Sequence, residues 1–163
     1  MFKKLLMAVL CGKRNGLIVN LTRMVYAGKK LPAELDRKHK AVCAVDAAFN
    51  HATVVGTPLK DIFAKGVAEY AKQGFANEWA LHHQGGPTGY QGRSYLGRPT
   101  EKRLVLPNQA FAWNPSIAGT KSEDTILVGS KGFEFLSTPS ADWPKIKVTA
   151  GNTEYERAGI KLL

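Results

Sequence analysis

Two adjacent histidines and one glutamate are the residues of this chain best suited to chemistry. His82 and His83 stand in a glycine-dense stretch, and Glu123 precedes a short apolar run that is typical of a strand. Neighbouring residues on a strand point to opposite faces, so only one of the two histidines can face a given site. A single imidazole needs carboxylate partners to hold a metal ion, and Glu123 is the best-placed acid. A histidine in such a loop also serves simply as a hydrogen-bonding group, and both interpretations stay open at this point.

The common catalytic and metal-binding signatures do not occur in the 163 residues. The chain has no Gly-x-Ser-x-Gly elbow, no phosphate-binding P-loop, no His-Glu-x-x-His and no Cys-x-x-Cys. Its only two cysteines, Cys11 and Cys43, exclude a disulfide framework and a cysteine-only zinc site. We expect both to be small buried packing residues.

A hairpin and two helices are predicted ahead of the histidines. An Asn-Gly pair at residues 15–16 separates two apolar runs, and this pair favours a hairpin because both residues tolerate positive φ. Apolar residues at helical spacing predict a first helix over about 33–54. Thr57 and Pro58 predict the N-cap and the first turn of a second helix.

Beyond residue 75 the chain changes to glycine-rich loops and short strands. The predicted strands are 103–106, 110–113, 125–128, 133–135 and 146–148. The order of a hairpin, two helices and then antiparallel strands predicts an α+β fold in which the helices pack on one face of a sheet. We expect a single domain over residues 1–163, since no repeat or linker interrupts the chain.

The net charge of +10 is concentrated near the start of the chain. Residues 1–40 hold ten Lys or Arg and two acidic residues, Glu34 and Asp36, which leaves 10 − 2 = +8 there. Clustered cations favour phosphate binding through counterion release. However, no aromatic residues interleave with the basic pairs to stack bases, and no nucleic-acid motif is present. A basic nucleic-acid-associated protein is therefore a disfavoured alternative, and a surface that meets an acidic neighbour explains the same charges.

The apolar run from Leu5 to Leu10 imitates a signal peptide but fits a strand better. It is at the lower length limit for such a segment, and bulky Leu10 precedes Cys11 where processing needs a small residue. A short apolar run bounded by charge and glycine is typical of a buried β-strand. No apolar run approaches the roughly 18 residues that a membrane-spanning helix needs. We therefore expect a cytoplasmic protein that does not contact a membrane.

Four motifs, in order, resemble the metallopeptidase family of the pita-bread fold, which includes methionine aminopeptidase, aminopeptidase P, prolidase and creatinase. They are Asn20-Leu21-Thr22-Arg23, similar to the family's Asp-x-Thr-Arg; His83 followed by Gly86; Asn114-Pro115; and Gly-Thr-Lys-Ser-Glu-Asp-Thr at 119–125. The resemblance covers about residues 5–128. It implies a partial pita-bread fold, with a curved antiparallel sheet and helices on one face.

The resemblance also implies a site for two divalent metals, but most of its ligands are replaced. The family uses two Asp, one His and two Glu, and the matching residues here are Val9, Asn20, His83, Asn114 and Glu123. Asparagine offers only a neutral carbonyl and valine offers no donor. We therefore expect no metal, with His83 and Glu123 as weak candidates for a single ion. Mn, Zn or Co becomes the expected cofactor only if this correspondence is misaligned.

Two functions are consistent with this resemblance. The first is a metal-free binding module or relic on an Xaa-Pro aminopeptidase/creatinase-like fold, with a small amide or peptide ligand. Its binding residues would be Asn20, Tyr90, Asn114 and Lys121. The alternative is a hydrolase of peptide or other C–N bonds, either prolidase-like or metal-independent like creatinase. In that case His83 is the acid/base catalyst, together with Glu123.

The resemblance further predicts an association surface. The family's domain has helices and a strand before the hairpin, whereas this chain begins at the hairpin. A sheet without that covering layer exposes an apolar face, which favours association. We therefore expect a truncated pita-bread domain that self-associates or binds a partner covering that face.

Overall fold

A long hairpin and two helices open the structure, a computed structural model that describes residues 4–163. Strands β1 (Leu5–Arg14) and β2 (Leu17–Tyr26) pair antiparallel, and helices α1 (Ala33–Ala52) and α2 (Leu59–Lys72) follow. Asn15 and Gly16 take φ values of 50° and 85° in the turn, which the hairpin needs and which this pair tolerates. The predicted hairpin and both helices are confirmed.

The remainder of the chain is built of short strands. A 3-10 helix, η1 (Glu78–Leu81), leads into the strands β3 (Gly85–Thr88), β4 (Gln109–Trp113), β5 (Ser116–Ile117), β6 (Thr120–Lys121), β7 (Asp124–Gly129), β8 (Gly132–Phe135), β9 (Lys145–Ala150), β10 (Thr153–Ala158) and β11 (Ile160–Leu162). The central sheet has the order β3-β4-β7-β8 and is antiparallel throughout. A second sheet has the order β1-β2-β11, in which β11 runs parallel to β2.

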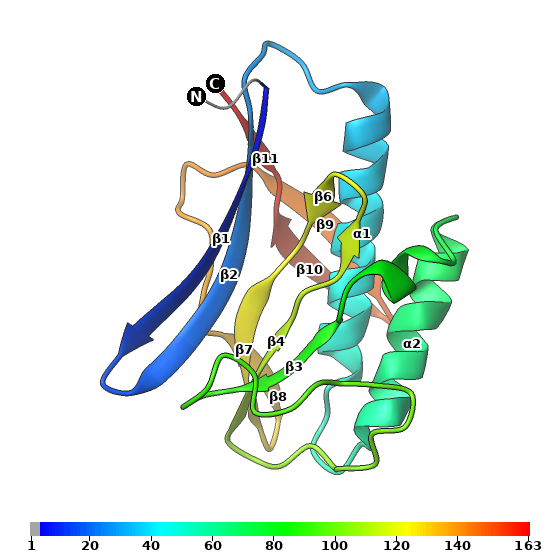
Figure 1. Cartoon of the computed structure of the whole chain (residues 1–163), viewed down its shortest axis with the longest axis vertical. Helices are drawn as coiled ribbons and strands as arrows, with labels where there is room; N and C mark the ends of the chain where they lie inside the picture. The colour runs from blue at the N-terminus through cyan, green and yellow to red at the C-terminus, as the bar shows by residue number, and fades with distance from the viewer. Residues whose placement is uncertain (1–3) are drawn as a thin grey trace.

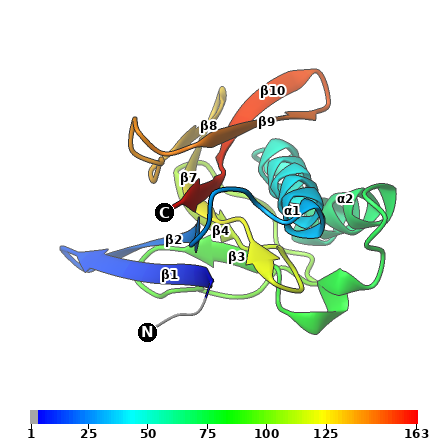
Figure 2. The same ribbon diagram turned by 90° about the horizontal axis from the view of Figure 1, so that it is seen from above.

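Both helices lie on the same side of the central sheet (Figure 1). Figure 2 shows the β9–β10 hairpin running past α1, with the β1–β2 hairpin on the far side of the central sheet from the helices. The fold is therefore of the α+β class, with helices on one face of an antiparallel central sheet, as the sequence predicts.

An aromatic stack joins the helices to the central sheet. The rings of Phe49 on α1 and Trp113 on β4 lie 4.7 Å apart at an interplanar angle of 14°, and both are fully buried. Trp113 Nε1 donates a hydrogen bond to Thr53 Oγ1 at 2.9 Å, so the indole N–H is not left unpaired in the core. Leu59 and Ile62 on α2 complete the same apolar cluster.

Three local predictions are wrong. Residues 103–106 form no strand, and only an isolated bridge joins Leu104 to Pro58. Pro58, not Thr57, is the residue that precedes the second helix, and this helix has no side-chain cap. The third concerns β1, which was expected to be buried but is largely exposed. Val9 and Leu10 are each 52% accessible, and Cys11, expected to be a buried packing residue, is exposed as well. The apolar residues correctly predict that β1 is a strand. It is exposed because it pairs only with β2 among the described strands.

None of the helices within residues 4–163 combines the length and apolarity needed to cross a bilayer.

Candidate functional site

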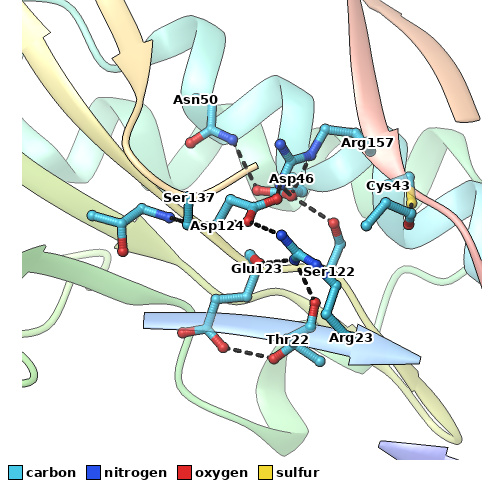
Figure 3. A network of polar contacts seen from close by, with 12 residues as sticks. Thr22, Arg23, Cys43, Asp46, Asn50, Ser122, Glu123, Asp124, Ser137 and Arg157 are labelled. Carbon is cyan, nitrogen blue, oxygen red and sulfur yellow. Dashed lines mark hydrogen bonds and ion pairs between the residues drawn. The ribbon is translucent and has the colours of Figure 1, made fainter. Parts of the chain in front are cut away.

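A buried network of two arginines and two aspartates connects β2, α1, β7 and β10 (Figure 3). Arg157 donates from Nε to Asp46 Oδ2 at 2.8 Å and from Nη2 to Asp124 Oδ2 at 2.9 Å. Arg23 Nη2 donates to the other oxygen of Asp124 at 2.8 Å. Arg23 is 9% exposed and the other three are 2% exposed or less. Two positive and two negative charges therefore compensate each other away from water, as buried charges require.

Hydroxyl and amide donors complete this network. Ser122 Oγ donates to Asp46 Oδ2 at 2.6 Å, and Asn50 Nδ2 donates to Asp46 Oδ1 at 2.9 Å. Burial raises the pKa of Asp46, while Arg157 and Ser122 oppose that rise. Ser122 and Asp124 both belong to the network and flank Glu123 in the sequence. The network therefore fixes the backbone that presents Glu123.

Both carboxylate oxygens of Glu123 are already engaged. Oε2 accepts a hydrogen bond from Thr22 Oγ1 at 2.7 Å, which is drawn in Figure 3, and Oε1 accepts one from Arg93 Nη2 at 2.7 Å. The pair of Arg93 and Glu123 is desolvated, with side-chain exposures of 13% and 3%. Arg93 thus neutralises the one acidic side chain that the sequence places in this site.

Arg93 contacts Glu123 directly and was not predicted from the sequence. It follows Gly92 in the loop after β3, and its Nη1 donates to the Gly92 carbonyl at 2.5 Å. Its Nε is buried without a hydrogen-bond partner among residues 4–163. The only sequence signal was a lone arginine in a glycine-rich loop, and nothing local links that loop to Glu123, which is 30 residues away.

Asn20 joins the hairpin to this loop. Its Nδ2 donates to Thr88 Oγ1 at 2.9 Å and to the Gly92 carbonyl at 3.4 Å, and the residue is 1% exposed. Its backbone N–H donates to Thr125 Oγ1 at 2.8 Å. The amide of Asn20 is therefore a positioning group for the loop that supplies Arg93.

Asn114 brings an unpaired acceptor to the same region. The residue is 5% exposed, and its Oδ1 has no hydrogen-bond partner in the described part of the chain. Asn114 follows the last residue of β4 and Glu123 precedes the first residue of β7, and those two strand residues, Trp113 and Asp124, are paired. Asn114 and Glu123 therefore lie at the same end of two neighbouring strands. A buried carbonyl without a donor costs free energy, which favours a role in accepting a hydrogen bond from a ligand.

Lys121 and the two histidines lie in the same region, and of these three Lys121 is the one that brings positive charge at pH 7. Lys121 is 7% exposed and forms no ion pair with residues 4–163. Burial lowers the pKa of Lys121, and Glu123 opposes that change. The expectation that His82 and His83 point to opposite faces of a strand is wrong, because both precede β3 and their rings stack at 4.3 Å. Burial lowers the pKa of His83 to about 4, and the charges of His82, Arg93 and Lys121 lower it in the same direction. The imidazole of His83, the predicted acid/base catalyst, is therefore neutral at pH 7.

Tyr90 lies elsewhere. It is 80% exposed, and its ring packs against Gly16 in the hairpin turn. The structure thus places Asn114, Lys121 and Glu123 near Arg93, whereas Tyr90 lies beside the turn of the β1–β2 hairpin.

The groups around Glu123 do not fit a pair of divalent cations. Val9 and Asn20 supply no carboxylate where the family has aspartates, and Glu123 has no oxygen free of a hydrogen bond. Arg93 and Lys121 place positive charge where two metals would need negative ligands. Among the residues that the structure describes, no three His, Cys, Asp or Glu side chains are grouped as metal ligands.

Solved structures with a similar backbone decide the fold. A recombinant prolidase from Thermococcus sibiricus matches with a TM-score of 0.74 at 17% identity, over 85% of this chain and 39% of the prolidase. The X-Pro aminopeptidase from Thermotoga maritima matches with a TM-score of 0.73 at 12% identity, over 98% of this chain and 41% of the aminopeptidase. The chain has the pita-bread fold of the prolidases. It spans about two fifths of the length of these enzymes.

The same fold also occurs in a protein of another kind. The N-terminal domain of a FACT complex subunit from chickpea matches with a TM-score of 0.68 at 11% identity, over 80% of this chain and 34% of that domain's chain. No protein-family model and no curated protein matches the sequence. Identities this low show a shared prolidase-like fold and leave the activity to be argued from the site.

Proposed function

We propose that the chain is a metal-independent binding module on a prolidase-like fold, which works in the cytoplasm and binds a small peptide-like ligand through an anionic group. One observation supports this most strongly. Glu123 is neutralised by Arg93, whereas Lys121 is buried beside them without a carboxylate partner in the described residues. The site therefore has a surplus positive charge where the family resemblance implies two metals and their carboxylates.

The unpaired atoms of the site suggest the chemistry of the ligand. Lys121 is suited to a carboxylate, since a charge-assisted hydrogen bond is about twice as strong as a neutral one. Asn114 Oδ1 is a buried acceptor and Arg93 Nε a buried donor, and neither has a partner in residues 4–163. An N–H of the ligand's α-ammonium group would satisfy the first, and a ligand oxygen would satisfy the second. A dipeptide with a free carboxylate contains all of these groups.

Calorimetric titration with glycyl-proline tests the proposal. Glycyl-prolinamide, which lacks the carboxylate, should bind about tenfold more weakly or worse, because a hydrogen bond to a charged group contributes roughly 1.5–3 kcal/mol. Lys121→Met should weaken glycyl-proline binding to the same extent. Lys102→Met, at an exposed lysine, is the matched control and should leave binding unchanged. Equal affinity for the acid and the amide, or a Lys121→Met variant that binds normally, would contradict the proposal.

The same samples separate binding from catalysis. Release of free proline, lost in His83→Ala, would favour the metal-independent hydrolase instead. Binding without release of proline is the result that we expect.

A further inference from the structure

The outer edge of β1 has backbone N–H and C=O groups that do not pair with another described strand. β1 runs for ten residues and pairs with β2 along its full length, while its other edge has no partner among the described strands. Figures 1 and 2 both show β1 at the outside of the molecule, away from the helices. A long edge strand of this kind can pair with an added chain unless charge, proline or a bulge blocks it.

The hydrogen-bond register shows which backbone groups are free. Ala27 N donates to Lys4 O at 2.7 Å, so Lys4 and Ala27 form a hydrogen-bonded pair just before Leu5 and Tyr26, the first pair of the ladder. Bonded and non-bonded pairs alternate along an antiparallel ladder. The N–H and C=O groups of every second residue of β1 therefore point away from β2. These residues are Leu5, Met7, Val9, Cys11 and Lys13.

The side chains around this edge are apolar and accessible. Leu6 is 39% exposed, Met7 38%, and Val9 52%, and the strand contains no proline. β-strand addition gains affinity from main-chain hydrogen bonds and specificity from alternate side chains. The edge offers both, over a length that accommodates an extended segment of about ten residues.

The basic residues at the ends of β1 favour an acidic partner. From residue 4 to residue 33 the chain has no Asp or Glu, and basic residues stand at both ends of β1: Lys4 at one end, Lys13 and Arg14 at the other. In a two-fold antiparallel pairing of β1 with β1 of a second copy, Lys4 of each copy would lie beside Lys13 and Arg14 of the other. Like charges opposed across a ladder are destabilising. A second copy is therefore a poor partner, and an acidic segment is a good one.

We propose that β1 is a docking edge for an extended, acidic segment of a partner protein, which adds to the hairpin as a further strand. The partner segment pairs with residues Leu5–Lys13 of β1, and its own residues alternate between apolar and polar. It has carboxylates at both ends, opposite the basic ends of β1. This interaction is independent of the Arg93–Lys121 site.

A designed peptide tests this docking edge. The fluorescein-labelled probe Asp-Glu-Thr-Val-Thr-Val-Thr-Val-Glu-Asp should bind, and the same peptide with Lys in place of each acid should not. The double variant Lys13→Glu/Arg14→Glu should bind the acidic peptide about tenfold more weakly, because two favourable cross-strand pairs become repulsive. The matched control Lys60→Glu/Lys65→Glu makes the same charge change at two exposed residues on α2, and should bind as the wild type does.

Amide hydrogen exchange places the peptide on the strand. In the free protein the outward-pointing amides of Met7 and Val9 should exchange rapidly, and the acidic peptide should slow them at least about tenfold. Three results would overturn the proposal: no binding of the acidic peptide, equal effects of the two charge-reversal variants, or sedimentation showing that β1 pairs with a second copy. Binding of single-stranded DNA at β1 in preference to the acidic peptide would also overturn it.

Discussion

Replacing Arg157 by methionine is the sharpest test of how the buried network positions the site. Arg157 is 2% exposed and bonds to both Asp46 and Asp124. Arg157→Met keeps most of the side-chain volume but leaves two buried carboxylates with one arginine, Arg23. The network then has a net charge of −1 without solvent to stabilise it.

The expected cost is large relative to the stability of such a domain. Removing one partner of a buried ion pair typically costs about 3–5 kcal/mol, against a total of roughly 5–15 kcal/mol for a native protein. For a chain of this size the melting temperature should fall by about 6–20 °C. Adding Asp46→Asn restores neutrality, so the double variant should recover about 1–3 kcal/mol relative to Arg157→Met.

Urea unfolding at pH 5 and pH 8 measures both effects. Burial raises the pKa of Asp46 above its ordinary value, and loss of Arg157 raises it further. A folded-state pKa above the unfolded value gives stability that is present at low pH and lost as the pH rises through the folded pKa. Arg157→Met should therefore cost more at pH 8 than at pH 5. A loss below about 1 kcal/mol, or a double variant no better than the single one, would refute the reasoning.

Burial also determines how His83, Cys43 and Gly66 should behave. In an NMR titration His83 should have its midpoint near pH 4, because burial lowers its pKa to about 4. The imidazole then binds a proton less readily in the folded protein than in the unfolded chain. The free energy of unfolding should therefore fall as the pH drops from 6.5 towards 4. A thiol reagent should label Cys11 in the native protein and leave Cys43 unlabelled, because Cys11 is exposed and burial raises the pKa of Cys43 to about 12. Gly66→Ala should destabilise the protein by about 1–3 kcal/mol in urea unfolding, since the added methyl would overlap the ring of Phe49.

Each of these has a contrary result. A His83 midpoint near 6.5 would show that the imidazole lacks this environment. Labelling of both thiols before unfolding would contradict the buried position of Cys43. A Gly66→Ala variant that is more stable than the wild type would mean that helix propensity outweighs the clash, since alanine is favoured over glycine by up to about 1 kcal/mol in a helix. Gly12→Ala is the control, because nothing lies within 4 Å of the added carbon.

The elements with local signals were predictable from the sequence. The turn at residues 15–16 and the apolar spacing of α1 and α2 depend on neighbours within a few residues, and the structure has all three. The exposure of β1 was not predictable, because an apolar run does not reveal whether another element covers it. Strand β11 was missed for a similar reason: it has three residues and owes its place to a parallel pairing with β2.

The site residues could be predicted only where they lie in a sequence motif of the family. The family resemblance pointed to Asn114, Lys121 and Glu123, which the structure brings to one region. Arg93 and Arg157 were missed, since their importance comes from partners 30 and 33 residues away in the sequence. Both arginines compensate carboxylates that reasoning from the sequence had treated as free or had not considered. Charge compensation across a fold depends on tertiary contacts, so spacing alone does not reveal it.

Metal content tests the central claim most directly. The purified protein would be incubated with Mn²⁺ or Co²⁺, desalted and analysed for bound metal. Because Arg93 and Thr22 occupy both oxygens of Glu123, and Lys121 adds positive charge, we predict almost no retained metal. About two ions per chain, as in a dinuclear hydrolase centre, would contradict the account.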